Sequence, residues 1–223
     1  MAGILFIISA PSGSGKSTLV GEVRRLVEGL DFSISYTTRE PRGSEEDGRE
    51  YHFTTRETFL KMVERGEFLE WAEVFGNFYG TALSALDHAR SIGRDLLLDI
   101  DVQGALQVIK KTPHAVSIFV LPPRKQELER RLRNRSQAEG MTQEAVIERR
   151  LSQAQVEISR LDGYQYALVN DKLDEAATEM RAIVLMERGQ GAEEERKLAQ
   201  NCLVAARSEH LKQALQSFSV DLP

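Results

Sequence analysis

The apolar positions of this chain follow two alternating patterns, short continuous runs and stretches with helical spacing. Continuous runs are typical of strands buried on both faces of a sheet. They cover residues 4–8, 96–100, 115–120 and 166–169. Helical spacing covers residues 19–30, 83–91, 102–110, 124–133 and 173–186. Alternating buried strands and helices predict an α/β fold, a parallel sheet with helices on both faces. Ligands of such sheets bind at the carboxyl ends of the strands.

One segment, residues 32–81, breaks this alternation and predicts a small mixed α/β insertion. Its predicted elements are a half-exposed strand at residues 32–38, a loop at 40–49, a short strand at 51–53, a helix at 55–65, and strands at 67–75 and 78–81 about the turn Gly76-Asn77.

A second insertion, residues 124–161, is charged and helical. Between Arg124 and Arg150 it has eight basic and five acidic residues, a local excess of positive charge in an acidic chain. This excess suits the binding of an anionic ligand.

The segment after Arg188 begins with a short linker, residues 189–191. Two apolar stripes with helical spacing follow, Leu198-Cys202-Ala205 and Leu211-Leu215-Phe218. Since the second stripe is displaced around the helix from the first, the pattern predicts a bent helix or two short ones. We expect the tail to pack on its parent domain or to support self-association with a second copy; disorder is the alternative.

The composition of the chain argues against several kinds of partner and site. The chain has 223 residues, 41% of them hydrophobic and 28% charged, with a net charge of −5. This balance gives no support for nucleic-acid or membrane binding, and no apolar stretch is long enough to span a bilayer. The single Cys202 excludes an internal disulfide. With no leader before the first strand, we expect a cytoplasmic protein. The four histidines are far apart, so we expect no metal site made by protein ligands alone.

The first apolar run leads into a glycine-rich turn and then a helix. The turn contains Ala10, Pro11, Ser12, Gly13, Ser14, Gly15, Lys16, Ser17 and Thr18. Glycines let successive backbone N–H groups point inward, and the helix N-terminus adds partial positive charge. Lys16 can then bind the terminal phosphates of a nucleotide, and Ser17 can bind Mg²⁺. The usual pattern begins with Gly where this chain has Ala10. The alternative is an ordinary turn, but the chain is expected to bind a nucleoside triphosphate.

Further motifs occur in the same order as in a known family. They are residues 35–42, 48–51, 66–72, 76–81, 98–104 and 169–171. Together with the glycine-rich turn they closely resemble guanylate kinases, from about Gly3 to Arg188. The resemblance implies ATP-dependent phosphorylation of GMP or dGMP on a three-part fold. It assigns residues 1–31, 82–123 and 162–188 to a P-loop core, 32–81 to a GMP-binding insertion, 124–161 to a lid, and leaves 189–223 as a C-terminal helical tail.

The acceptor's phosphate needs cations and hydrogen-bond donors. Arg39 and Arg42 can offer bidentate guanidinium groups, and Tyr51 and Tyr79 can donate their hydroxyls. The family uses these positions in that role. The alternative for the two arginines is a solvated surface position.

The guanine base presents donors on its ring imino and amino groups and an acceptor on its carbonyl. The carboxylates of Glu70 and Asp101 suit the donors, whereas adenine would leave such carboxylates unsatisfied. The hydroxyls of Ser35 and Thr81 suit the carbonyl oxygen, as the resemblance also implies. Alternatively, Glu70 is an exposed strand carboxylate. For Asp99 and Asp101 the alternative is a helix N-cap, and otherwise Asp99 is assigned to Mg²⁺ through water or to the P-loop.

The resemblance assigns Arg131, Arg135 and Arg150 to the lid, where they would stabilise negative charge on the transferring phosphoryl group. The alternative is a salt-bridged helix face. The segment 136–142 is about four residues longer than the family's usual one. Asn170 is placed near adenine by resemblance alone.

Two other functions share this core. One is a kinase that phosphorylates a sugar, which the pair Glu70 and Asp101 argues against. The other is a non-catalytic interaction module, which the intact Gly15-Lys16-Ser17 and the lid argue against.

Overall fold

The computed structural model of the protein describes residues 3–74, 76–138 and 144–219. The chain forms two compact units, and the division between them falls within the first strand. Unit 1 comprises Met1–Ile7 and Gly29–Ala115, and unit 2 comprises Ile8–Glu28 and Val116–Pro223. The finer division into core, insertion, lid and tail stays a prediction.

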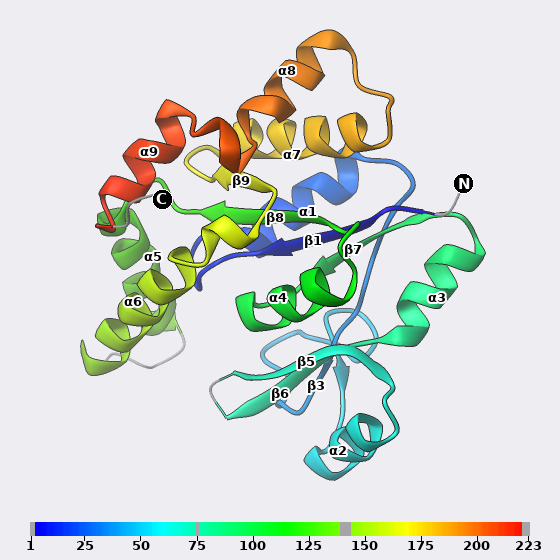
Figure 1. The fold of residues 1–223 in the computed structure, drawn as a ribbon. Helices are drawn as coiled ribbons and strands as arrows, with labels where there is room; N and C mark the ends of the chain where they lie inside the picture. The colour runs from blue at the N-terminus through cyan, green and yellow to red at the C-terminus, as the bar shows by residue number, and fades with distance from the viewer. Residues whose placement is uncertain (1–2, 75, 139–143, 220–223) are drawn as a thin grey trace. The chain divides into compact units, whose positions relative to one another are not determined.

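The fold is α/β, with a parallel central sheet flanked by helices, as the sequence predicted (Figure 1). The strand order is β2-β7-β1-β8-β9. The pairs β2–β7 and β8–β9 are parallel. The strands are β1 (Leu5–Ser9), β2 (Leu30–Phe32), β7 (Asp95–Asp99), β8 (Val116–Leu121) and β9 (Tyr166–Val169). Every residue of β1 is buried, which explains its continuous apolar run.

Unit 1 also contains a four-stranded sheet with the order β4-β3-β6-β5. Its strands are β3 (Tyr36–Thr37), β4 (His52–Phe53), β5 (Phe68–Val74) and β6 (Asn77–Ala82). The helices of unit 1 are α2 (Arg56–Glu64), α3 (Leu83–Ser91) and α4 (Val102–Lys111). Thr55 caps the N-terminus of α2, since its hydroxyl accepts a hydrogen bond from the Thr58 N–H at 3.1 Å.

An aromatic cluster fixes α2 on this sheet. Phe59 stacks on Phe68 with ring centroids 4.5 Å apart and on Phe78 at 5.4 Å, and Met62 completes the buried set. Phe78 therefore faces α2. Its neighbour Tyr79 faces the opposite side of the sheet, because side chains alternate along a strand.

The prediction of one strand over residues 32–38 is wrong. Phe32 ends β2 and pairs with Leu97 in the central sheet, whereas Tyr36 begins β3 and pairs with Gly80 in the four-stranded sheet. The alternation of residue types is real, but backbone pairing to two different sheets separates its halves.

Unit 2 contains the helices α1 (Lys16–Leu26), α5 (Lys125–Ala138), α6 (Glu144–Ile158), α7 (Leu173–Glu187), α8 (Glu193–Asn201) and α9 (Glu209–Gln216), with 3₁₀ turns at η1 (Leu161–Gly163) and η2 (Val204–Ala206). The helical character predicted for residues 124–161 is confirmed by α5 and α6. The lengthened segment 136–142 lies partly outside the described residues.

The tail forms two short helices, one of the two predicted arrangements. Figure 1 shows α8 running along α7 and α9 beside the lid helices. Between the two helices, Leu203 forms an antiparallel bridge with Tyr166 of β9. The expectation that the tail packs on its parent domain is confirmed by these contacts.

A search of the described helices finds none with the length and apolarity needed to cross a membrane.

Candidate active site

The glycine-rich turn of unit 2 has the backbone of an anion-binding loop. Gly13 has a φ of 90° and Gly15 a φ of 84°, values that favour glycine because a Cβ would be strained there. A side chain at Gly15 would also meet Nδ2 of Asn170 at 2.5 Å. Ala10 has no positive φ, so the departure from glycine at this position introduces no backbone strain.

The turn ends directly on a helix N-terminus. Gly15 is the N-cap of α1 and offers no side chain to its first N–H groups, which therefore remain suited to a phosphate. Lys16 is the first, half-buried residue of α1, and Ser17 and Thr18 follow it on the exposed side. The residues present thus fit the phosphates of ATP, with the Ser17 hydroxyl available to Mg²⁺.

Two side chains donate hydrogen bonds to the carbonyl oxygen of Ser14, which lies in the glycine-rich turn. Asn170, which is 6% exposed, donates from Nδ2 at 2.9 Å. Arg131 of α5 donates from Nη1 at 3.3 Å, and both its terminal nitrogens also reach the carbonyl of Asn170 at 3.3 Å. Helix α5, which belongs to the predicted lid, is therefore tied to the phosphate turn.

Glu127 orients Arg131 by accepting from its Nε at 2.8 Å. The hydrogen bond from Arg130 is the largest cause of a lowered pKa at the Glu127 carboxyl, and the bond from Arg131 adds a smaller effect. The pKa is about 2. The carboxylate is thus charged throughout the neutral range and keeps Arg131 in place.

The other lid arginines lie farther along. Arg150 of α6 donates from Nη1 to the Ser136 hydroxyl at 3.2 Å, which joins the two lid helices. Arg135 is exposed on α5. Arg131 does form an ion pair on its own helix, with Glu127 at 2.8 Å, as the alternative of a salt-bridged face expected. The neighbouring Arg133 pairs with Glu129 and Glu144.

In unit 1, the guanidinium of Arg39 is paired with a carboxylate. Its Nη1 lies 2.9 Å from Glu45 Oε2, and its Nη2 donates to Oε1 at 3.0 Å. The same carboxylate accepts the backbone N–H of Arg42 at 2.8 Å. Burial opposes the shift, but these bonds lower the pKa of Glu45 below its ordinary value. Glu45 therefore organises both predicted phosphate-binding arginines.

Aromatic rings complete this cluster. The Arg39 guanidinium lies 5.3 Å from the ring centroid of Tyr51, and Tyr51 packs edge-on against Tyr79 at 5.9 Å. The Arg39 side chain is only 10% exposed. The structure thus brings together three of the four residues predicted for the acceptor phosphate, and Arg42 joins them through its backbone.

Two of the predicted guanine residues, Glu70 and Thr81, face each other on paired strands of the four-stranded sheet. Glu70 of β5 is 2% exposed and pairs with Thr81 of β6, so the alternative of an exposed strand carboxylate is wrong. Thr81 lies two residues after Tyr79, hence on the same face. Ser35, also buried, precedes β3.

Burial is the main reason that the pKa of the Glu70 carboxyl is raised to about 7. The hydroxyl and N–H of Thr81 oppose this rise, and the charge of Asp101 adds to it. The Thr81 hydroxyl is close enough to influence the pKa but makes no hydrogen bond of normal geometry to any described residue. A buried acceptor beside a buried hydroxyl is an arrangement suited to a polar ligand.

Asp101 caps the N-terminus of α4, with Oδ1 accepting from Gln103 N at 2.7 Å and from Gly104 N at 3.1 Å. The N-cap alternative is therefore confirmed for Asp101, while its contact with guanine stays a prediction. Asp99 is the half-buried last residue of β7, and its role toward Mg²⁺ also stays a prediction. A Cβ on Gly104 would overlap Oε2 of Glu70, so any other residue there would force this carboxylate to move.

The family model described as guanylate kinase matches residues 3–187. The chain belongs to the guanylate kinase family. It is 58% identical over 188 residues to the guanylate kinase of Koribacter versatilis (strain Ellin345), covering 84% of this chain and 80% of the relative. It is 51% identical to that of Syntrophotalea carbinolica (strain DSM 2380 / NBRC 103641 / GraBd1), covering 83% and 86%. The crystal structure of guanylate kinase from Anaplasma phagocytophilum is similar with a TM-score of 0.67 at 31% identity, covering 99% of this chain and 97% of that one.

Within this guanylate kinase, sequence reasoning missed three supporting residues. Glu45 and Glu127 hold predicted arginines, and Gly104 makes room for Glu70. The spacing of Glu127 and Arg131, four apart on a helix, was an available signal. So was a carboxylate within the same loop as Arg39 and Arg42. Nothing in the sequence signalled the Gly104 contact.

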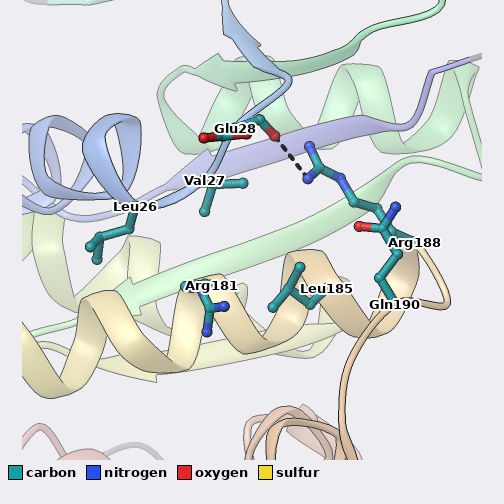
Figure 2. A pocket seen from close by; sticks show the side chains of 7 residues that line it. All are labelled: Leu26, Val27, Glu28, Arg181, Leu185, Arg188 and Gln190. Carbon is teal, nitrogen blue, oxygen red and sulfur yellow. Dashed lines mark hydrogen bonds between the residues drawn. The ribbon is translucent and has the colours of Figure 1, made fainter.

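A surface pocket of about 300 Å³ lies in unit 2 (Figure 2). Leu26, Val27 and Leu185 form its apolar part, and Arg188 donates from Nη1 to the Glu28 carbonyl at 2.9 Å. Leu26 ends α1, about 15 Å along the helix axis from its phosphate-facing end. The pocket therefore lies away from the glycine-rich turn, which is the predicted site for the ATP phosphates. Among the described residues no group of three or more His, Cys, Asp or Glu could hold a metal ion.

Proposed function

We propose that this protein transfers the γ-phosphoryl group of ATP to GMP or dGMP, giving ADP and GDP or dGDP, with Mg²⁺. The family supports the reaction, and one observation carries the choice of base. Glu70 is a carboxylate buried to 2% exposure opposite the buried hydroxyl of Thr81. A buried acceptor of this kind is stable with a ligand that offers donors, as guanine does and adenine does not.

On the acceptor side, Glu70 and Asp101 accept hydrogen bonds from the guanine imino and amino groups. The hydroxyls of Ser35 and Thr81 donate to the guanine carbonyl. The phosphate is bound by the arginine and tyrosine cluster, made up of Arg39, Arg42, Tyr51 and Tyr79. Its position on the same sheet face supports a single nucleotide spanning both groups.

On the donor side, the turn from Ala10 to Thr18 surrounds the ATP phosphates with backbone N–H groups. Lys16 neutralises their charge, and Asn170 lies beside the adenine. Ser17, and Asp99 through water, would hold Mg²⁺, and the ion would supply further positive charge to the phosphates. The N-terminus of α1, uncapped by a side chain, supports this assignment.

The chemistry needs no general base, because the GMP phosphate is already ionised. Catalysis is then orientation and charge stabilisation. Lys16, Arg39 and Arg42 hold the phosphoryl groups. Arg131, Arg135 and Arg150 of the lid stabilise the charge that develops during transfer. The contacts of Arg131 with the phosphate turn support its role.

We place the protein in the cytoplasm, without nucleic-acid or membrane partners. Self-association through the tail is also a proposal. The tail's packing on its own unit leaves the exposed faces of α8 and α9 for such a contact.

The decisive experiment is a coupled assay with ATP and a panel of nucleoside monophosphates. GMP and dGMP should be used at least about 1,000-fold better than AMP. Lys16→Ala should abolish turnover without loss of fold. A preference for AMP, or full activity of the Lys16 variant, would refute the proposed function.

A further inference from the structure

The tail pairs with the outer edge of β9, the last strand in the order of the central sheet. The N–H of Ala167 donates to the Cys202 carbonyl at 2.8 Å, and the N–H of Val204 donates to the Gln165 carbonyl at 3.0 Å. Beyond this bridge α9 buries Leu211, Ala214 and Leu215, and Phe218 just after the helix is buried as well. These residues follow the part of the chain that the family model matches.

The end of α9 then contacts the start of the first lid helix. The Ser217 hydroxyl accepts the N–H of Lys125, the first residue of α5, at 3.0 Å. The same hydroxyl donates to the Ala214 carbonyl at 2.7 Å. The first N–H groups of a helix have no partner inside it. Ser217 therefore caps α5 from a position 92 residues away in the chain.

A second bond reaches the other lid helix. Gln155, in the last turn of α6, donates from Nε2 to the Phe218 carbonyl at 3.2 Å. The start of α5 and the end of α6 are where the lid joins the rest of unit 2. Ser217 and Phe218, which are adjacent in the tail, therefore form hydrogen bonds with the start of α5 and the end of α6.

The helix that Ser217 caps also carries Arg131, which contacts the Ser14 carbonyl of the phosphate turn. We infer that Ser217 is a positioning residue for phosphoryl transfer. It fixes the first turn of α5 and so keeps Arg131 over the phosphate turn. This inference rests on the proposed role of Arg131 in catalysis.

The test compares four variants of the full-length protein. Ser217→Ala removes the cap, and Ser217→Thr keeps a hydroxyl at the same place. Ser208→Ala is the matched control, because Ser208 caps α9 itself through the Leu211 N–H and not α5. Arg131→Ala measures the catalytic role on which the inference rests.

Loss of one N-cap typically changes an equilibrium constant about fivefold. Ser217→Ala should therefore speed hydrogen exchange in residues 125–128 about fivefold and lower kcat by up to the same factor, with KM for GMP unchanged. Ser217→Thr should restore both values. Ser208→Ala should lower the melting temperature without changing kcat. Arg131→Ala should lower kcat about 100-fold.

Two results would overturn the inference in distinguishable ways. If Arg131→Ala lowers kcat but Ser217→Ala behaves like Ser208→Ala, the tail acts on stability alone and the inference is wrong while the proposed function stands. If Arg131→Ala leaves kcat unchanged, the assigned role of Arg131 is wrong, and the inference fails with it.

Discussion

The raised pKa of Glu70 predicts that binding of GMP depends on pH. Guanine offers donors to this carboxyl, so only the ionised form accepts both of them. In the protein without substrate the pKa is about 7. Lowering the pH through 7 should therefore protonate Glu70 and weaken GMP binding, while binding of ATP, which does not meet this carboxyl, should stay unchanged.

The size of the effect follows from the ionised fraction. With a pKa of about 7, this fraction is roughly 0.97 at pH 8.5 and roughly 0.24 at pH 6.5. KM for GMP should thus rise about fourfold over this range, measured by steady-state kinetics at saturating ATP. A phosphate monoester itself titrates near pH 6, so the range stops at 6.5. The variant Glu70→Gln corrects for any remaining effect of the phosphate.

Glu70→Gln should bind GMP more weakly at every pH and with a nearly flat profile. The same residue should affect folding. Because its pKa rises from 4.5 to about 7 on folding, its contribution is most favourable below pH 4.5 and is lost as the pH rises through 7. The loss amounts to about 3 kcal/mol. Relative to the wild type, Glu70→Gln should therefore gain stability between pH 4.5 and pH 8 in denaturant unfolding. Parallel pH profiles of the two proteins, in binding and in unfolding, would refute this reasoning.

Three further predictions concern single side chains. Gly104→Ala should lower kcat/KM for GMP about 100-fold, because the added methyl would displace the Glu70 carboxylate, which we propose binds guanine. Gly21→Ala, at an open position of α1, is the control and should be neutral. Glu45→Gln should raise KM for GMP about three- to tenfold by releasing the guanidinium of Arg39, with KM for ATP unchanged; a lower KM would mean that Glu45 competes with the phosphate. Leu215→Ala should destabilise the fold by about 2–5 kcal/mol in chemical unfolding, since this residue is 2% exposed, and an unchanged midpoint would contradict the packed tail.

The elements with a single clear pattern were predictable from sequence. The run at residues 4–8 corresponds to β1, which is buried throughout, and the helix at residues 83–91 corresponds to α3. Residues 32–38 were not predictable in the same way. Their alternation suits a half-exposed strand in either sheet, and only the pairing partners, Leu97 for Phe32 and Gly80 for Tyr36, decide between them.

The chemical residue types of the site were predictable, but their supports were less so. The spacing of glycines and Lys16 identifies the phosphate turn because the backbone geometry is local. The resemblance supplied Glu70, whose burial depends on tertiary packing. The fit of α4 against this carboxylate joins residues 34 positions apart through the missing side chain of Gly104. A contact defined by an absent atom leaves no pattern in the sequence.

The antiparallel bridge between Tyr166 and Leu203 has a consequence for the nascent chain. Strand β9 stands last in the order of the central sheet, and among the described residues its outer backbone groups are paired by residues near Leu203. During synthesis, β9 leaves the ribosome well before that partner. For this interval its edge can pair with a strand of another chain. Translation products that stop before Cys202 should therefore form aggregates while the full-length protein does not. By pairing with β9 at the end of synthesis, the tail would increase the yield of folded protein.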